Sequence, residues 1–193
     1  RQIVSASAIG IYPNSPTKVY TEDFKGHDDS FLGNVVVKWE QSVDKFQQLP
    51  IKVCKIRTGV VFAKQGGALQ EMTKPIKFGL GAAFGSGNQV TSWIHLHDIA
   101  NLYRFAVTQQ LEGTFNAVTP HPITNEALTK MLAKKMHKPL FLPNIPQFIM
   151  KLMLGEMHNL LFSDQNVSAQ KILDNGFAFK FPTPEDALTD IIQ

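Results

Sequence analysis

The chain has 193 residues, of which 44% are hydrophobic and 18% charged, and its formal net charge is +3. This length and composition allow a buried core, which excludes a disordered protein. Lysines are scattered among acids, and no run of about 18 apolar residues occurs, so we expect neither a nucleic-acid-binding nor a membrane protein. The single cysteine, Cys54, excludes an internal disulfide and fits a cytoplasmic protein.

The first segment, RQIVSASAIGIY, has no initial methionine and enters a strand pattern at once. Ile3 and Val4 lead into small residues and then Ile9, as in a buried strand. Because domains seldom begin within a strand, we expect the chain to be the later part of a longer protein. Ser5 and Ser7 fall at the end of this strand, where α/β enzymes place functional side chains, but the GxSxG motif is absent.

A helix is predicted from about Phe31 to Gln48, where Pro50 stops it. The following run, IKVCKIRTGVVFA, ends in continuous apolar residues that are typical of a strand covered on both faces. Strand, helix and strand in this order predict a βαβ unit with a right-handed crossover and a parallel sheet. Arg57 in the second strand needs an anionic partner, which is either a cofactor or an acid of the protein itself.

The pattern becomes mixed beyond Gly66 and Gly67. ALQEMTKPIKFGL, HDIANLYRFAVTQQ and TNEALTKMLAKKMH predict helices, TSWIHL and GTFNAV predict short strands, and FIMKLMLGEMHNLLF predicts an amphipathic helix. Thr124 is the expected N-cap of the third of these helices, with Glu126 in its first turn. A further helix is predicted in FPTPEDALTDII, near the end of the chain. Its expected N-cap, first-turn proline and capping-box acid are Thr183, Pro184 and Asp186.

Four glycines stand close together in FGLGAAFGSGNQV, at Gly79, Gly81, Gly85 and Gly87. A dinucleotide-binding loop lies between a strand and the helix that follows it, because the helix N-terminus holds the pyrophosphate. Here the spacing is GxGxxxGxG, a strand follows, and the P-loop lysine is absent. The stretch is therefore interpreted as a substrate-side or structural loop.

His95, His97 and Asp98 raise the alternative of a metal site. If residues 91–96 form a strand, both imidazoles point to one face. A zinc site needs three or four protein ligands, and no second histidine or cysteine cluster supplies them. We therefore expect no metal; instead Asp98 caps the following helix and one histidine makes a local hydrogen bond.

Several long motifs occur in an order that resembles a known family: SASAIGIY, FLGNVVVKWE, IRTGVVFAKQGGAL, FGLGAAFGSGNQVTSWIHLHD and the tail from about Pro143. The chain resembles an extended, atypical short-chain dehydrogenase/reductase of the NAD(P)-dependent sugar epimerase-like family, whose C-terminal domain has no known function. The resemblance covers essentially the whole chain. It implies an α/β fold, the C-terminal part of a Rossmann-type parallel sheet with a smaller α/β substrate-binding lobe.

The resemblance also implies how the chain is divided. Residues 1–65 would hold the later strands and helix of the Rossmann domain, 66–142 the mixed substrate lobe and the return strands of the sheet, and 143–193 the family-specific C-terminal domain. The N-terminal Rossmann half, with the glycine-rich cofactor loop, would lie upstream of Arg1.

In these reductases a tyrosine transfers the proton, a lysine four residues later lowers its pKa, and a strand-end serine orients the substrate oxygen. Ser7 matches the serine, whereas the places of the tyrosine and lysine fall near Leu32 and Val36. None of the three tyrosines is followed by lysine four residues later. Tyr12 could supply a phenol and Lys38 a charge; the alternatives are that Tyr12 packs under the PNSP turn and that Lys38 is a solvated lysine.

By the same resemblance the cofactor is NADP or NAD, with most of its site upstream. Five residues of this chain are expected to contact it: Ser5, Arg57, Gly59, Val60 and Val61. Three further residues are expected to belong to the substrate lobe: Gly85, Gly87 and His95.

The predicted function is an NAD(P)-dependent oxidoreductase or a nucleotide-sugar epimerase-like protein acting on a small hydroxylated substrate. The alternative is a catalytically weak NADP(H)-binding sensor or scaffold protein that lacks the YxxxK relay. The helix over 31–48 corresponds to a dimer contact in such enzymes, which suggests a homodimer.

Overall fold

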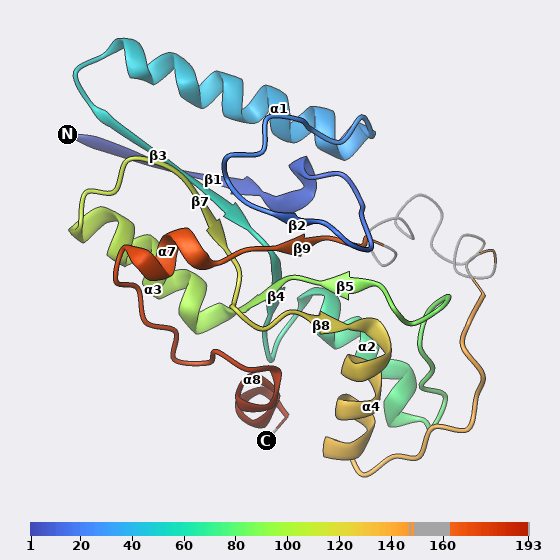
Figure 1. Cartoon of the computed structure of the whole chain (residues 1–193). Coiled ribbons are helices and arrows are strands. Elements are labelled where there is room, and N and C mark those ends of the chain that lie inside the picture. Colours follow the sequence, from blue (N-terminus) through green and yellow to red (C-terminus); the bar gives the residue numbers. More distant parts are fainter. Residues whose placement is uncertain (147, 149–162, 193) are drawn as a thin grey trace.

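The computed structural model describes residues 1–146, 148 and 163–192 (Figure 1). At its centre lies a parallel three-stranded sheet of order β1-β3-β7, formed by β1 (Gln2–Ala8), β3 (Lys52–Thr58) and β7 (Gly113–Ala117). Their last residues, Ala8, Thr58 and Ala117, stand side by side in register. The predicted α/β class and the parallel pairing of the first two long strands are confirmed.

Helices cover both faces of this sheet. Helix α1 (Phe31–Asp44) lies on one face and α3 (Leu96–Thr108) on the other (Figure 1). Ser30 starts α1 because its side chain accepts a hydrogen bond from the Gly33 N–H. The helix continues as a 3-10 turn, η2 (Lys45–Gln48), so the predicted end at Gln48 is confirmed.

The long strand predicted for IKVCKIRTGVVFA is in fact two strands, a correction. After β3 the chain leaves the central sheet at Gly59, and β4 (Val60–Phe62) pairs in parallel with β6 (Trp93–His95). The Gly59 N–H donates to the Ala117 carbonyl at 3.1 Å, and the Val60 N–H donates to the Ser92 carbonyl at 3.0 Å. The apolar run is continuous because both strands are buried, but the strands belong to different sheets.

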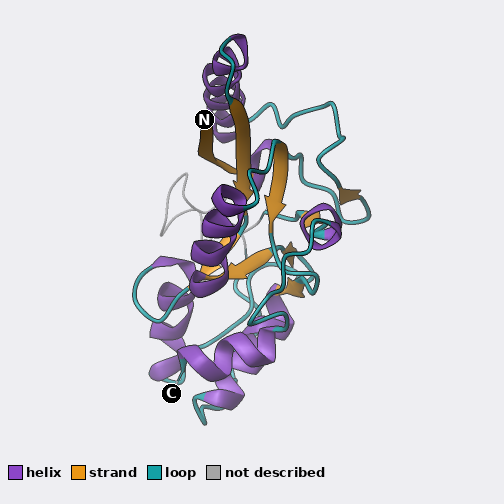
Figure 2. Ribbon diagram, turned by 90° about the vertical axis from the view of Figure 1, so that its left-hand side faces the viewer, coloured by secondary structure: helices purple, strands orange, loops and turns teal. Residues whose placement is uncertain are grey.

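The remaining elements form a second lobe and short connections. They are η1 (Ile9–Ile11), β2 (Val19–Tyr20), α2 (Gly67–Lys77), β5 (Val90–Thr91), β8 (Ile123–Thr124), α4 (Asn125–Lys135), β9 (Asn166–Val167), α7 (Gln170–Asp174) and α8 (Pro184–Ile191). Strand β2 pairs with β9, and β5 pairs with β8. Figure 2 shows α2, α4 and α8 at the opposite end of the molecule from α1. The predicted caps Thr124 and Thr183 both accept the expected backbone N–H.

Two hydrophobic clusters correspond to the two ends of the molecule. Ile56, Leu102 and Phe115 belong to the cluster around the central sheet. Phe62 and Trp93 belong to the second cluster, where their rings stack with centroids 4.7 Å apart. The three-part division at 65/66 and 142/143 stays a prediction.

Among the residues that the structure describes, the helices are too short or too polar to cross a membrane. The amphipathic helix predicted for FIMKLMLGEMHNLLF lies, apart from Phe148, outside the described residues.

Candidate functional site

A polar layer lies between the central sheet and α1. Ser7, Arg57 and Asn116 are neighbours in register across β1, β3 and β7, and they are 4%, 8% and 0% exposed. Side chains two residues apart on a strand share a face, so Lys55 follows Arg57 in the same layer. Polar groups buried in this way need partners, because an unpaired one is strongly disfavoured.

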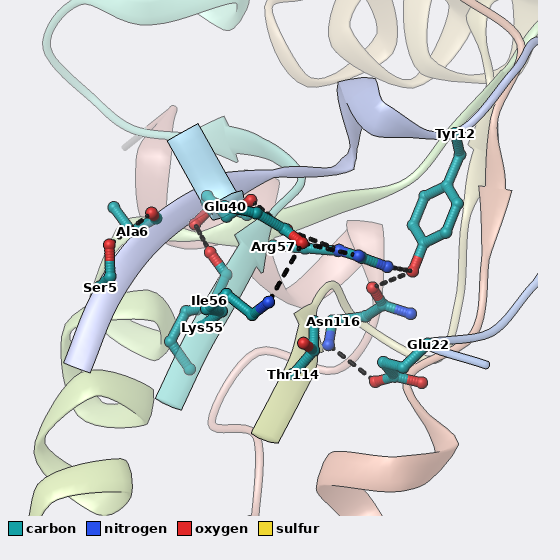
Figure 3. A network of polar contacts seen from close by, with 12 residues as sticks. Ser5, Ala6, Tyr12, Glu22, Glu40, Lys55, Ile56, Arg57, Thr114 and Asn116 are labelled. Carbon is teal, nitrogen blue, oxygen red and sulfur yellow. Dashed lines mark hydrogen bonds and ion pairs between the residues drawn. The ribbon is translucent and has the colours of Figure 1, made fainter. Parts of the chain in front are cut away.

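Glu40 on α1 is the centre of this layer (Figure 3). Its Oε1 accepts hydrogen bonds from the Ser7 Oγ at 2.6 Å and the Arg57 Nε at 2.8 Å, and its Oε2 accepts from the Arg57 Nη2 at 2.9 Å. Lys55 contributes a further ammonium group, 3.6 Å from Glu40 and 2.6 Å from Asp44. The anionic partner of Arg57 is therefore an acid of the protein itself, one of the two predicted alternatives.

These contacts keep Glu40 ionised. Burial disfavours its charge, but hydrogen bonds from Arg57 and Ser7 outweigh burial and hold the pKa of this carboxyl below its usual value. Because Ser7 donates its proton to a carboxylate, its oxygen retains lone pairs. The Ser7 hydroxyl can therefore accept a hydrogen bond from a further group, whereas donating one requires it to release Glu40.

Tyr12 completes the network from the segment after β1. Its hydroxyl accepts a hydrogen bond from the Arg57 Nη1 and donates one to the Asn116 Oδ1, both at 2.8 Å (Figure 3). The side chain is fully buried and its ring stacks on Tyr20. Burial raises the pKa of Tyr12 although Arg57 opposes the shift, so the phenol stays protonated. In this arrangement Tyr12 holds Arg57 and Asn116 in place.

The outer edge of β7 is closed by polar side chains. The Asn116 N–H donates to the Glu22 Oε1 at 2.7 Å (Figure 3), and Lys171 donates to the Thr114 carbonyl at 2.8 Å. The Asn116 amide also donates to the Ser168 carbonyl. Two segments far apart in the sequence, one with Glu22 and one with Ser168 and Lys171, are thus bonded to β7.

Three of the predicted site residues, Ser7, Tyr12 and Arg57, come together in one network. Lys38 does not join them: its side chain is exposed on α1. Ser5 is half-buried and its hydroxyl donates to the Ala6 carbonyl at 3.0 Å. Their predicted catalytic and cofactor-binding roles stay predictions.

The predicted cofactor contacts after β3 lie at the carboxyl end of the sheet. Val60 and Val61 are half-buried in β4. A Cβ atom on Gly59 would stand 2.7 Å from the Ser92 carbonyl oxygen and 2.7 Å from Val118 Cγ1. The packing of the protein alone therefore explains the glycine, and contact with a cofactor stays a prediction.

The loop between α2 and β5 carries the two predicted glycines of the substrate lobe. The Gly85 N–H donates to the Ile145 carbonyl at 2.8 Å. Gly87 has φ of +76°, and a Cβ there would stand 2.9 Å from the Glu126 Cβ. Close packing and the positive φ explain the glycine at position 87, while a role of either glycine in substrate binding stays a prediction.

His95 ends β6 and is itself the N-cap of α3, because its Nδ1 accepts a hydrogen bond from the His97 N–H at 3.1 Å. The predicted local histidine hydrogen bond is confirmed.

The prediction for Asp98 is wrong: its carboxylate accepts hydrogen bonds from the backbone N–H groups of Lys180 and Phe181, both at 2.9 Å. His97 lies in α3, so the two imidazoles do not share a strand face. Within the described ranges, no three His, Cys, Asp or Glu side chains are grouped to hold a metal.

The buried imidazole of His95 makes stability depend on pH. Burial lowers the pKa of His95, although Asp190, whose Oδ2 is 3.4 Å from Nε2, and Asp98 oppose this. Below the ordinary value of 6.5 the unfolded chain takes up this proton more readily than the folded chain, so the free energy of unfolding falls as pH falls. We expect His95→Asn, which keeps a capping side chain, to reduce this fall in urea unfolding between about pH 5.5 and 7.5.

His121→Asn is the matched control, since the His121 side chain is exposed and is not among the charges that act on His95. It should leave the pH dependence as in the unaltered chain. An equal flattening in both variants would contradict the assignment to His95.

The fold and the site define a class: a Rossmann-type α/β protein with polar side chains gathered at the carboxyl end of its parallel strands and a second, smaller lobe. A domain family described as a domain of unknown function, DUF1731, matches residues 145–191. The chain is 36% identical to the epimerase family protein SAR0825 of Staphylococcus aureus, over 98% of this chain and 63% of that protein. It is 34% identical to the epimerase family protein YfhF of Bacillus subtilis, over 100% of this chain and 63% of that protein.

Solved structures of epimerase family proteins also resemble this chain. The human epimerase family protein SDR39U1, crystallised with NADPH, superposes with a TM-score of 0.89 at 30% identity, over 99% of this chain and 65% of that one. A nucleoside-diphosphate sugar epimerase from Corynebacterium glutamicum superposes with a TM-score of 0.80 at 26% identity, over 99% of this chain and 37% of that one. The predicted resemblance to the extended short-chain dehydrogenase/reductase-like epimerase family is confirmed by these matches. The chain spans slightly less than two thirds of the curated relatives named above.

Proposed function

We propose that this chain is part of an NAD(P)-dependent oxidoreductase or nucleotide-sugar epimerase-like protein that acts on a small hydroxylated substrate. The observation that carries the proposal is the close superposition on a human relative crystallised with NADPH. In open α/β sheets, ligands bind outside the carboxyl ends of the strands. Two residues there fit a closely approaching cofactor, because Ala8 and Thr58 are small, adjacent and only half-buried.

Bound NADP or NAD would supply the hydride acceptor or donor. This chain would contribute the surface beside it, from Ser5, Gly59, Val60 and Val61. Ser7, held by Glu40, would accept a hydrogen bond from the reacting hydroxyl and so orient it. Tyr12 and Arg57 would act as positioning residues, since their polar groups are occupied within the network.

A second candidate function is a cofactor-binding sensor or scaffold with weak turnover. The observation that favours it is the burial of the whole network: Ser7, Tyr12 and Arg57 are at most 8% exposed, and each is bonded to protein groups. The absence of YxxxK in the sequence supports the same candidate. Both candidate functions require cofactor binding, so only a measurement of turnover distinguishes the enzyme from the sensor or scaffold.

The decisive experiment is a fluorescence titration of NADPH and NADH against this chain and against the longest form that its gene encodes. Saturable binding by the longer form supports either function, and absence of binding by both forms overturns both. Turnover of candidate nucleotide sugars by the longer form then favours the enzyme. If Ser7→Ala leaves that turnover unchanged, the role given to Ser7 is wrong.

An exposed apolar stripe on α1 suggests how two copies meet. Leu32, Val35 and Trp39 are 44%, 43% and 43% exposed and follow the i, i+3, i+7 spacing of one helix face. We expect a homodimer through this face, with twice the 21.5 kDa chain mass in light scattering. Trp39→Asp should yield single chains, because it places a charge in the apolar contact, while Gln41→Asp on the exposed side of the same helix should not. A single-chain mass for the unaltered protein contradicts the prediction.

A further inference from the structure

Two loops of the second lobe are bonded to each other. One follows α2 and begins at Phe78, and the other follows α4 and runs to Ile145 (Figure 1). The Ile145 N–H donates to the Ala83 carbonyl, and the Gly85 N–H donates to the Ile145 carbonyl, both at 2.8 Å. Leu140 and Ile145 pack against the second hydrophobic cluster. These contacts hold the two loops together as one surface.

Four large apolar side chains of these loops are between 45% and 82% exposed: Phe78, Leu80, Phe141 and Leu142. We call these four side chains the loop patch. A Cβ atom on Gly81 would stand 2.8 Å from Leu140 Cδ2, so the stretches that carry the loop patch are adjacent. Exposed apolar patches mark sites of interaction with proteins or membranes.

The charge around the loop patch has one sign. Residues 72–97 and 127–146 contain six lysines and no aspartate or glutamate. Three of these lysines pair with acids outside the two ranges. The other three are exposed, and none of them has an acidic partner among the residues that the structure describes: Lys77, Lys134 and Lys138. They lie at the ends of α2 and α4, where the two loops start, so the loop patch is bordered by cations that can meet an anionic surface.

We propose that the loop patch binds the surface of a membrane that carries anionic lipids. Phe78 and Phe141 would enter the interfacial region of the bilayer, and Lys77 and Lys138 would face the headgroups. Phenylalanine and leucine beside lysines are typical of interfacial sites, and each lysine near an anionic leaflet adds to the attraction. Binding of this kind takes place at the surface of the bilayer and requires no spanning helix.

The geometry and the charge favour a bilayer over a protein as the occupant. Two loop patches placed face to face would bring the unpaired lysines of two copies together, and like charges repel. A bilayer needs no complementary pocket, so it can surround side chains that project into solvent as far as Phe78 and Phe141 do. An acidic protein partner would need pockets of matching shape for these anchors, and it is an outcome of the test.

Vesicles test the proposal. We expect the longest form that the gene encodes to co-sediment with vesicles of phosphatidylcholine and phosphatidylserine in a ratio of about 2 to 1. It should bind vesicles of pure phosphatidylcholine at least about tenfold more weakly, because the lysines then lack anionic partners. Equal binding to both kinds of vesicle would overturn the proposal. Binding to neither would overturn it as well and would favour a protein partner.

Variants locate the site. Phe141→Ser should weaken binding at least about tenfold, because one phenylalanine is no longer buried in the bilayer. Phe31→Ser is the matched control, since Phe31 is 80% exposed on α1, at the opposite end of the molecule (Figure 2). Lys138→Gln should weaken binding about fivefold. Lys45→Gln is its control, because Lys45 is exposed and follows α1.

Equal losses in the loop variants and in their controls would overturn the proposal, because they would indicate non-specific adsorption. Unchanged binding in folded Phe141→Ser would overturn it as well. Circular dichroism should show that all four variants are folded. NADPH titration of the longer form tests the proposed function separately, since vesicle binding requires no cofactor.

Discussion

Replacement of Glu40 by alanine should lower the free energy of unfolding by about 3–5 kcal/mol, the cost of breaking a buried ion pair from one side. Glu40 is 6% exposed, and its removal leaves the guanidinium of Arg57 and the ammonium of Lys55 beside a cavity, each less than 10% exposed. Ser7 also loses its acceptor. Urea unfolding of the two chains, followed by circular dichroism, measures the difference.

The control for this change is Glu71→Ala. Glu71 also pairs with a lysine, Lys74, but the two side chains are 65% and 57% exposed, so the loss should stay below about 0.5 kcal/mol. Glu40→Gln keeps the shape of the side chain, so its loss in free energy of unfolding should lie between those of Glu40→Ala and Glu71→Ala. A loss below about 1 kcal/mol for Glu40→Ala would mean that the buried ion pair does not stabilise the layer between α1 and the sheet.

The hydrogen-bond and ion-pair partners of the predicted site residues could not be predicted from the local sequence pattern. Ser7 is predicted from its place at a strand end, Tyr12 as a substitute for the missing tyrosine of the relay, and Arg57 from the need of a strand arginine for an anion. Glu40 was not predicted as a site residue, although it carried a signal. It lies on the buried face of α1 with Gly33, Val36 and Val43, and an acid on such a face requires a partner.

Asn116 carried no such signal. It lies 104 residues from Tyr12 in the sequence, and only the register of β7 beside β3 brings the two together. The same holds for Asp98, which resembled a helix cap but binds the amides of Lys180 and Phe181, 82 and 83 residues away. Local chemistry predicted that these side chains need partners; the partners depend on tertiary structure.

The fold was predictable where helix periodicity and caps agree. Helices α1, α3 and α4 appeared near their expected positions, and Thr124 and Thr183 cap as expected. The division of one predicted strand into β3 and β4 was not predictable, because apolar residues continue across the break. What separates the two strands is contact with Ser92 and Val118, which a local window cannot contain.

That break leads to the second large effect, which we expect for Gly59→Ala. The added Cβ would lie 2.7 Å from the Ser92 carbonyl oxygen, a backbone atom fixed by its hydrogen bond from the Val60 N–H, and 2.7 Å from Val118 Cγ1. Val118 is fully buried, so neither neighbour moves freely. The overpacking should lower the free energy of unfolding by about 2–3 kcal/mol in urea denaturation.

Gly10→Ala is the matched control, because a Cβ on Gly10 would have no atom within 4 Å. It should be neutral or slightly stabilising, since alanine reduces the freedom of the unfolded chain by about 0.4–1 kcal/mol. If Gly59→Ala is as stable as Gly10→Ala, then the approach of β6 to this glycine does not hold β4 away from the central sheet. If Gly59→Ala is destabilised and the longer form still binds NADPH with unchanged affinity, the glycine serves the packing of the strands rather than contact with the cofactor.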